Sequence, residues 1–210
     1  MARGRRSAKY MPHKRPAGRR PVGVRIIGGR LRGRKLEYSG DLRTRPMKDR
    51  VREALFNLLG RAVDDKVAID LFAGTGALAI EALSRGALRA ILIERHRATA
   101  EAIRRNAAML GVDALAEVIT ADTFLWAKSP PDLDPRPWLV FCSPPYDFYI
   151  SRKTDLLGLL HHLIEISPPG SLLVVEADDR FDFRELPDAD HWDIRAYPPT
   201  VLGIWEKQVV

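Results

Sequence analysis

Short runs of apolar residues alternate with amphipathic stretches through the central part of the chain. The runs lie at 67–71, 90–93, 117–120, 138–142 and 171–176, and their length and apolar content are typical of strands buried inside a sheet. Between them, apolar positions recur at helical spacing over 77–85, 99–110 and 156–166. Strands that alternate with helices predict an α/β fold with a doubly wound, mostly parallel sheet.

Further elements are predicted on both sides of this core pattern. Residues 22–38 have the signature of a β-hairpin with glycines in its turn region, and a helix is expected from near Lys48 to Leu59. Closing strands at 190–196 and 201–205 bring the sheet to seven strands. We therefore predict three parts: a tail without periodicity over 1–21, expected to be disordered, a hairpin extension over 22–45, and a catalytic domain over 46–210.

The first of these strands ends in a pattern that suits a nucleotide-like ligand. Asp70 closes the apolar run, and Gly74 and Gly76 follow it just before the predicted helix. Glycines let the backbone approach a ligand closely, while the free N–H groups of a helix N-terminus point toward it. The same glycines also fit the dinucleotide fingerprint, and Glu94 at the end of the next strand is placed to hold a ribose diol in either case.

Charge is distributed unevenly along the 210 residues. Residues 1–52 hold 18 Lys or Arg against three acidic residues, a net charge of +15, so the rest of the chain carries −8 of the total +7. A cationic front joined to a mildly acidic body indicates a polyanionic partner, which we predict to be a nucleic acid. The basic side chains expected to contact it are Arg25, Arg30, Arg32, Arg34, Lys35, Arg43 and Lys48.

Cysteine usage and hydropathy exclude several classes of protein. A single cysteine, Cys142, rules out an internal disulfide and suits a reducing compartment, so we expect a cytoplasmic protein. No run of 18 apolar residues is present, and the basic front lacks the apolar segment of a secretory signal. No Cys/His cluster has the spacing of a metal site, and we assign no chemistry to the five histidines.

A second chemical motif, Ser143-Pro144-Pro145-Tyr146, follows the fourth predicted strand. A hydroxyl and the carbonyl of Pro144 offer two acceptors to the hydrogens of an exocyclic amine. The two prolines stiffen the loop and remove competing donors. Tyr146 is suited to stack on a base that has left its helix. This arrangement predicts amine methylation by positioning rather than by acid–base chemistry.

With these motifs the chain resembles the RsmD-like family of small-subunit ribosomal RNA guanine-N2 methyltransferases. The matching stretches are 25–29, 32–36, 44–46, 49–57, 70–78, 81–87 and 144–146. The resemblance implies the class I methyltransferase fold, S-adenosyl-L-methionine as the cofactor and ribosomal RNA or a small-subunit assembly intermediate as the partner. We expect the protein itself to be a monomer. The cofactor residues expected from the resemblance and from the pattern are Thr44, Arg45, Asp70, Phe72, Gly74, Gly76, Glu94, Asp122, Thr123 and Ser143. The residues expected to present the base are Ser143, Pro144, Pro145 and Tyr146.

One position departs from the family. The family carries Asp or Asn where this chain has Ser143, and Ser-Pro-Pro-Tyr is common in enzymes that methylate cytosine N4. The alternatives are therefore a cytosine-N4 methyltransferase, or a catalytically weak RNA-binding or ribosome-assembly protein on the same scaffold. Asp122 is expected to accept from the adenine amine with Phe124 packed beside the ring, but either residue could instead cap or fill the next helix.

Overall fold

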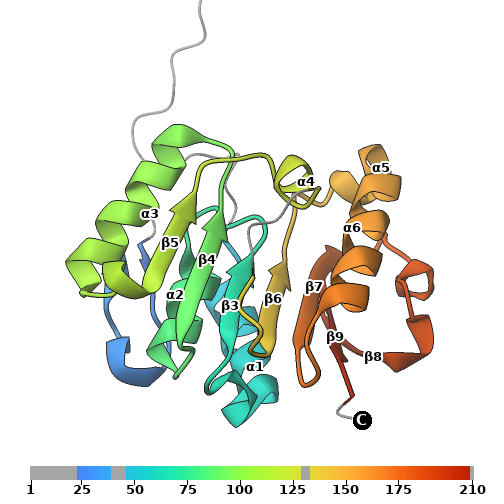
Figure 1. The fold of residues 1–210 in the computed structure, drawn as a ribbon, viewed down its shortest axis with the longest axis horizontal. Coiled ribbons are helices and arrows are strands. Elements are labelled where there is room, and N and C mark those ends of the chain that lie inside the picture. Colours follow the sequence, from blue (N-terminus) through green and yellow to red (C-terminus); the bar gives the residue numbers. More distant parts are fainter. Residues whose placement is uncertain (1–22, 39–45, 129–132, 209–210) are drawn as a thin grey trace, which may run out of the picture.

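A computed structural model describes residues 23–38, 46–128 and 133–208. Its main sheet has seven strands in the order β5-β4-β3-β6-β7-β9-β8 (Figure 1). The strands are β3 Val67–Asp70, β4 Arg89–Ile93, β5 Ala116–Ile119, β6 Trp138–Cys142, β7 Leu172–Asp178, β8 Trp192–Tyr197 and β9 Thr200–Glu206. The first five run parallel, and β9 and β8 are antiparallel additions at one edge. The predicted fold class is confirmed.

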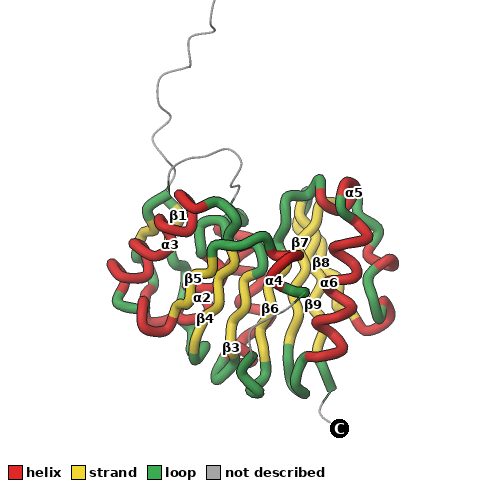
Figure 2. The backbone as a smooth tube through the Cα atoms, turned by 45° about the horizontal axis from the view of Figure 1, so that its top comes forward, coloured by secondary structure: helices red, strands yellow, loops and turns green. Residues whose placement is uncertain are grey.

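Helices cover both faces of this sheet (Figure 2). They are α1 Asp49–Leu59, α2 Ala77–Ser84, α3 Arg97–Leu110, α4 Thr123–Trp126, α5 Phe148–Ser151 and α6 Lys153–Ile166, with short 3-10 helices η1 Gly29–Leu31, η2 Gly60–Val63, η3 Asp113–Leu115, η4 Phe183–Glu185 and η5 Ala189–His191. Side chains alternate across the strands, so that Phe141 faces α1 and α2 whereas Val140 and Cys142 face α5 and α6. Each face therefore has its own apolar core.

The burial pattern of α1 differs from the one that its spacing predicts. The position of Leu58 along the helix predicts a core residue, but it is 42% exposed, whereas the Arg52 side chain is fully buried. The Arg52 guanidinium donates to the backbone carbonyls of Met47 and Arg25 at 3.0 and 2.6 Å and to the Asp49 carboxylate at 3.0 Å. These acceptors compensate for the lost hydration of the charge, which helical periodicity alone cannot anticipate.

The predicted hairpin is present as a two-stranded sheet of β1 Val24–Arg25 and β2 Lys35–Leu36, with η1 in its turn. Buried Glu81 on α2 anchors it by accepting hydrogen bonds from the amides of Ile27 at 2.8 Å and Gly28 at 2.7 Å. Gly29 adopts φ +70°, and a Cβ there would lie 1.9 Å from the Ser84 carbonyl oxygen. Only glycine fits this close approach, so the hairpin docks as a fixed part of the α2 face.

Candidate active site

The two motifs singled out by the sequence follow β3 and β6, whose carboxyl-terminal ends lie at the same edge of the sheet (Figure 1). β3 and β6 are direct neighbours, and Asp70 pairs with Phe141 in their register. The glycine turn after β3 and the Ser-Pro-Pro-Tyr loop after β6 therefore start side by side. This is the edge at which doubly wound sheets bind their ligands.

The glycine turn has the backbone shape that its sequence indicates. Gly74 and Gly76 adopt φ values of +52° and +76°, in the left-handed region that favours glycine. Gly76 caps the N-terminus of α2, and a Cβ at this position would lie 3.0 Å from Ile103. The turn thus passes close to α3 and presents the first amides of α2 at the strand edge.

Asp70 is a buried carboxylate at the base of this turn. Its pKa is raised from 3.8 to about 7, mainly by burial and to a smaller extent by the nearby carboxylates of Glu94 and Glu176, whereas hydrogen bonds from the amides of Phe72 and Ala79 oppose the shift. Its Oδ1 atom is buried and has no hydrogen-bond partner among the described residues. A buried carboxylate oxygen without a donor is suited to bind a cationic or hydrogen-bonding group of a ligand. The ammonium group of S-adenosylmethionine has this chemistry, so the site fits the expected cofactor.

Glu94 and Asp122 end the next two strand segments toward the same edge. Glu94 is buried and accepts from the Gly74 amide at 3.0 Å and the His96 amide at 2.7 Å, which ties the glycine turn to β4. Asp122 caps α4 by accepting from the amides of Phe124 and Leu125 at 2.9 and 3.3 Å. The predicted capping role of Asp122 is thus confirmed. The carboxylates of Glu94 and Asp122 each still have lone pairs that could accept from a ligand.

An aromatic cluster lies beside these carboxylates. The rings of Phe72, Phe124 and Phe148 lie 5.8–6.1 Å apart, and the Arg152 guanidinium lies 3.9 Å from the Phe124 ring. The buried hydroxyl of Thr123 donates to the Leu71 carbonyl, so it joins α4 to the end of β3 rather than pointing outward for a ligand. Phe72 is in the cluster, where an aromatic ring can pack against a planar base.

The Ser-Pro-Pro-Tyr loop is fixed to the neighbouring strand β7 by its hydroxyl groups. The Ser143 hydroxyl donates to Oε2 of Glu176, and the Tyr146 hydroxyl donates to Oε1 at 2.9 Å and lies 3.2 Å from Thr200 Oγ1. Burial, together with the charge of Glu176, raises the pKa of Tyr146 to about 12. Pro144 is buried and Pro145 is exposed. Ser143 and Tyr146 are therefore held in one orientation by a single carboxylate.

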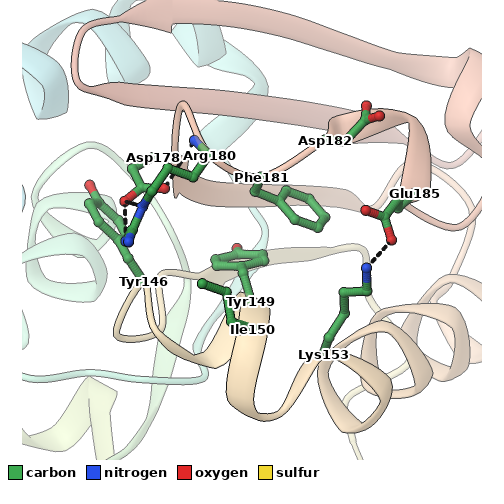
Figure 3. A pocket seen from close by; sticks show the side chains of 9 residues that line it. All are labelled: Tyr146, Tyr149, Ile150, Lys153, Asp178, Arg180, Phe181, Asp182 and Glu185. Atoms are coloured by element: carbon green, nitrogen blue, oxygen red, sulfur yellow. Dashed lines mark hydrogen bonds and ion pairs between the residues drawn. The ribbon is translucent and has the colours of Figure 1, made fainter.

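A pocket of about 260 Å³ opens beside Tyr146 (Figure 3). The Tyr149 and Phe181 rings, 4.5 Å apart, form part of its wall. Arg180 pairs with Asp178 on one side of it, and Lys153 pairs with Glu185 on the other. The pocket thus combines aromatic faces with charged rims directly next to the loop that is expected to hold a base.

The basic residues of the hairpin lie away from this edge. Arg30, Arg32, Arg34 and Lys35 are exposed, and the Leu31 amide donates to Ser84 Oγ at the far end of α2. The eight residues of α2 separate the hairpin turn from the glycine turn by about 12 Å. Arg25 pairs with Asp49 at 2.9 Å, and Lys48 is exposed nearby. Thr44, Arg45 and Arg43 lie outside the described residues.

Three residues at this edge were not anticipated from the sequence: Phe148, Arg152 and Glu176. Phe148 and Arg152 follow the tyrosine of the motif closely, but no periodicity marks them. Glu176 had a signal, since an acidic residue inside an otherwise apolar strand is seldom buried without a partner. Its partners, 30 and 33 positions earlier in the chain, became visible only in the folded structure.

The described residues lack two features that would indicate other classes of protein, a membrane-spanning helix and a metal-binding cluster. No helix there has the length and apolar character needed to cross a membrane. In the same ranges, no three His, Cys, Asp or Glu side chains are grouped in a way that suits a metal ion.

Comparison with known proteins finds relatives that match most of the chain. A family model described as "Conserved hypothetical protein 95" matches residues 24–197. Ribosomal RNA small subunit methyltransferase D of Escherichia coli (strain K12) is 42% identical over 148 residues, which are 70% of this chain and 67% of that protein. The putative rRNA methyltransferase YlbH of Bacillus subtilis (strain 168) is 35% identical over 156 residues, 73% of this chain and 82% of that protein.

Solved structures share the fold over most of the chain. The putative methyltransferase yhhF from Escherichia coli superposes with a TM-score of 0.72 at 30% identity, covering 89% of this chain and 98% of that one. An RNA methyltransferase from Salinibacter ruber, solved in complex with S-adenosyl-L-homocysteine, has a TM-score of 0.57 at 23% identity, covering 79% of this chain and 95% of that one. The second likeness supports the fold alone.

Proposed function

The chain belongs to the conserved hypothetical protein 95 family, and on that basis we propose that it is an S-adenosylmethionine-dependent methyltransferase that modifies the N2 amine of a guanine in small-subunit ribosomal RNA. The observation that carries the proposal is the juxtaposition, at adjacent strand ends, of the buried Asp70 carboxylate, one oxygen of which lacks a hydrogen-bond partner, with the Ser-Pro-Pro-Tyr loop. One element suits a methyl donor and the other suits an amine acceptor.

The residues around the glycine turn are proposed to hold the cofactor. Asp70 would bind the ammonium group of its methionine part, and Gly74 and Gly76 would line that part. Glu94 would accept from the ribose hydroxyls and Asp122 from the adenine amine. When bound, S-adenosylmethionine supplies an electrophilic methyl group, to which the guanine N2 lone pair forms a bond as the methyl–sulfur bond breaks.

The loop after β6 is proposed to present the guanine. The Ser143 hydroxyl oxygen and the Pro144 carbonyl would accept hydrogen bonds from the two amine hydrogens, which orients the nitrogen lone pair. Tyr146 would pack against the base, a contact worth roughly 1–3 kcal/mol. No general base is needed in advance, because the amine loses its proton to water after the new C–N bond forms. Positioning therefore supplies most of the rate.

The direct test is methyl transfer from labelled S-adenosylmethionine to small ribosomal subunits that lack the family's modification, followed by nucleoside analysis. We expect the label on guanine N2. Label on cytosine N4 would instead support the second candidate, which rests on the Ser143 hydroxyl alone and is not favoured by the relatives. Intact cofactor binding without any transfer would point to a binding protein.

The basic hairpin is proposed to bind the RNA backbone. Arg30, Arg32 and Lys35 are exposed, and none of them forms an ion pair with another described residue. Replacing all three with Gln should weaken RNA binding and reduce the slope of log K against log[salt] by about 2, because each neutralised phosphate contributes roughly 0.7–0.9. Filter binding over a salt series measures this slope.

The matched control for the hairpin variant is Arg195→Gln. This exposed arginine lies on β8, at the opposite edge of the sheet from β5, and should leave the slope unchanged. Deleting residues 1–21, which carry eight basic residues, should flatten the slope further. If the hairpin variant retains the full slope, these residues do not contact phosphates.

The remaining expectations about partners and location are also part of the proposal. Relatives that are ribosomal RNA methyltransferases support an RNA substrate. We propose that the substrate is a small-subunit assembly intermediate, that the protein acts as a monomer, and that it works in the cytoplasm, where such particles are made. Analytical ultracentrifugation and co-sedimentation with subunit precursors would test the first two of these.

A further inference from the structure

Glu176 is the buried acidic residue that connects the two halves of the Ser-Pro-Pro-Tyr loop. It is 6% exposed and lies on β7, next to β6 in the sheet. Its two carboxylate oxygens accept from different hydroxyls, Ser143 on one and Tyr146 on the other. Its backbone carbonyl accepts from the Tyr149 hydroxyl at 2.8 Å. Three side chains that follow β6 thus converge on one residue of β7.

The contact with Glu176 decides how the Ser143 hydroxyl can act. A hydroxyl has one proton to donate and two lone pairs with which to accept. An isolated serine could turn its proton toward an amine and repel it. Because the proton of Ser143 is given to Glu176, the oxygen faces other groups as an acceptor only. An Asp or Asn at this position, as in the related family, offers such an acceptor oxygen without assistance.

We propose that Glu176 is a positioning residue for methyl transfer. It accepts hydrogen bonds from the hydroxyls of Ser143 and Tyr146. These bonds keep the Ser143 oxygen available as an acceptor for the substrate amine and hold the Tyr146 ring in its stacking orientation. The inference rests on the proposed function and adds a residue to it. In this chain Ser143 and Glu176 together provide the hydrogen-bond acceptor that a single Asp or Asn side chain would provide.

The surroundings of Glu176 are consistent with this role. Burial raises its pKa, and the hydrogen bonds from Ser143 and Tyr146 oppose that shift. A carboxylate removed from water at this depth is stabilised mainly by such donors. Asp70 is the other buried acid close enough to interact with it, and Asp178 lies near Tyr146 on the pocket side. Both are acidic groups, so the hydroxyls of Ser143 and Tyr146 are the favourable partners of Glu176.

The test compares Glu176→Gln in two backgrounds. A Gln amide can accept from only one of the two hydroxyls and presents N–H to the other, so Ser143 loses its fixed role. With Ser143 in place we expect kcat for guanine methylation to fall about tenfold, or ~1.4 kcal/mol, at unchanged affinity for S-adenosylhomocysteine. With Ser143→Asn, whose amide oxygen accepts by itself, Glu176→Gln should change kcat less than about twofold.

The outcomes separate positioning from structure. If Glu176→Gln lowers kcat equally with Ser143 and with Ser143→Asn, Glu176 only supports the loop. If Glu176→Gln does not lower kcat when Ser143 is present, the proposal is overturned. Glu165→Gln, an exposed acid on α6, is the matched control for the same chemical change. If Glu176→Gln does not fold, Ser143→Ala and Ser143→Asn replace it: loss in the first and retention in the second support the role, and full activity of Ser143→Ala overturns it.

A second readout does not depend on activity. The pKa of Tyr146 is about 12 in part because of the Glu176 charge, so Glu176→Gln should lower it toward the ordinary 10. NMR titration of labelled tyrosine, with Tyr146→Phe identifying the signal, should show Tyr146 ionising at a lower pH in the variant than in the wild type, although its burial remains. An unchanged titration would refute the contact. If the wild type and Ser143→Asn methylate no guanine, the proposed function fails while this result still stands.

Discussion

Replacing Asp70 with asparagine should lower the affinity for S-adenosylhomocysteine about 100-fold, or ~3 kcal/mol, and at the same time raise the melting temperature at pH 8. The carboxylate is fully buried and one of its oxygens lacks a partner. The cofactor ammonium would supply both the missing donor and an opposite charge, and a charged hydrogen bond in a dry site is among the stronger single contacts. Calorimetric titration measures the affinity.

The stability gain follows from the sign of the pKa shift. Because burial raises the folded-state pKa of Asp70 from 3.8 to about 7, the folded protein holds a proton that the unfolded chain releases between these values. Stability is therefore lost as the pH rises from about 4 to 7, by roughly 4 kcal/mol in total, and stays low above 7. Asparagine carries no charge at any pH and avoids this loss, so the variant should melt several degrees higher at pH 8.

The same shift predicts how cofactor affinity varies with pH. Below about pH 7 the free protein must first release the Asp70 proton, so affinity should fall toward acid pH and reach a plateau above 7. The asparagine variant should show no such dependence. Asp113→Asn, at an exposed position in η3, is the matched control and should alter neither affinity nor its pH profile. A variant that binds as tightly as the wild type would remove Asp70 from the cofactor site.

Replacing Tyr146 with alanine should lower single-turnover methylation about 100-fold while changing S-adenosylhomocysteine affinity less than about twofold. The ring is proposed to stack on the guanine, worth roughly 1–3 kcal/mol, and its hydroxyl is anchored to Glu176 at 2.9 Å. The alanine variant loses both the stacking surface and the anchored orientation. We therefore expect it to impair binding and positioning of the guanine but not binding of the cofactor. Rapid-quench kinetics with saturating cofactor, together with calorimetry, measure the two effects separately.

Tyr146→Phe is the graded control, because it keeps the ring and removes only the hydroxyl contacts with Glu176 and Thr200. Its rate should lie between those of the wild type and the alanine variant. Parallel losses of cofactor affinity and turnover in Tyr146→Ala would show instead that the residue supports the whole strand edge, and its assignment to the base would have to be abandoned.

Much of the fold could be predicted because the relevant information is local. The apolar run at Trp138–Cys142 became β6 with the same bounds, and the glycines after Asp70 adopt the left-handed conformations that their type indicates. A buried strand must be continuously apolar, and a tight turn into a helix needs glycine, whatever the rest of the chain does. The resemblance in the motifs then led to the family, which comparison confirmed.

Other features depend on partners that are distant in the sequence. Arg52 is buried and Leu58 is exposed because the hairpin and Met47 supply acceptors to a guanidinium, a circumstance that helical periodicity does not record. Thr123 joins α4 to β3, and Glu176 receives hydroxyls from a loop 30 residues earlier. Asp70, Ser143 and Glu176 lie on or next to β3, β6 and β7. They come close together only because these three strands are neighbours in the sheet, and that order depends on pairing between whole strands.

The sequence by itself therefore determined most of the strands and helices and the class of chemistry, and it predicted candidate residues for the site. Only the tertiary structure decided which polar groups are buried together and which hydroxyl gives its proton to which carboxylate. The physical reason is that apolar burial is a property of each segment, whereas satisfying a buried charge requires a specific donor at hydrogen-bond distance. At Ser143 this difference matters most, since its proposed role as an acceptor depends on a hydrogen bond to Glu176 of the adjacent strand.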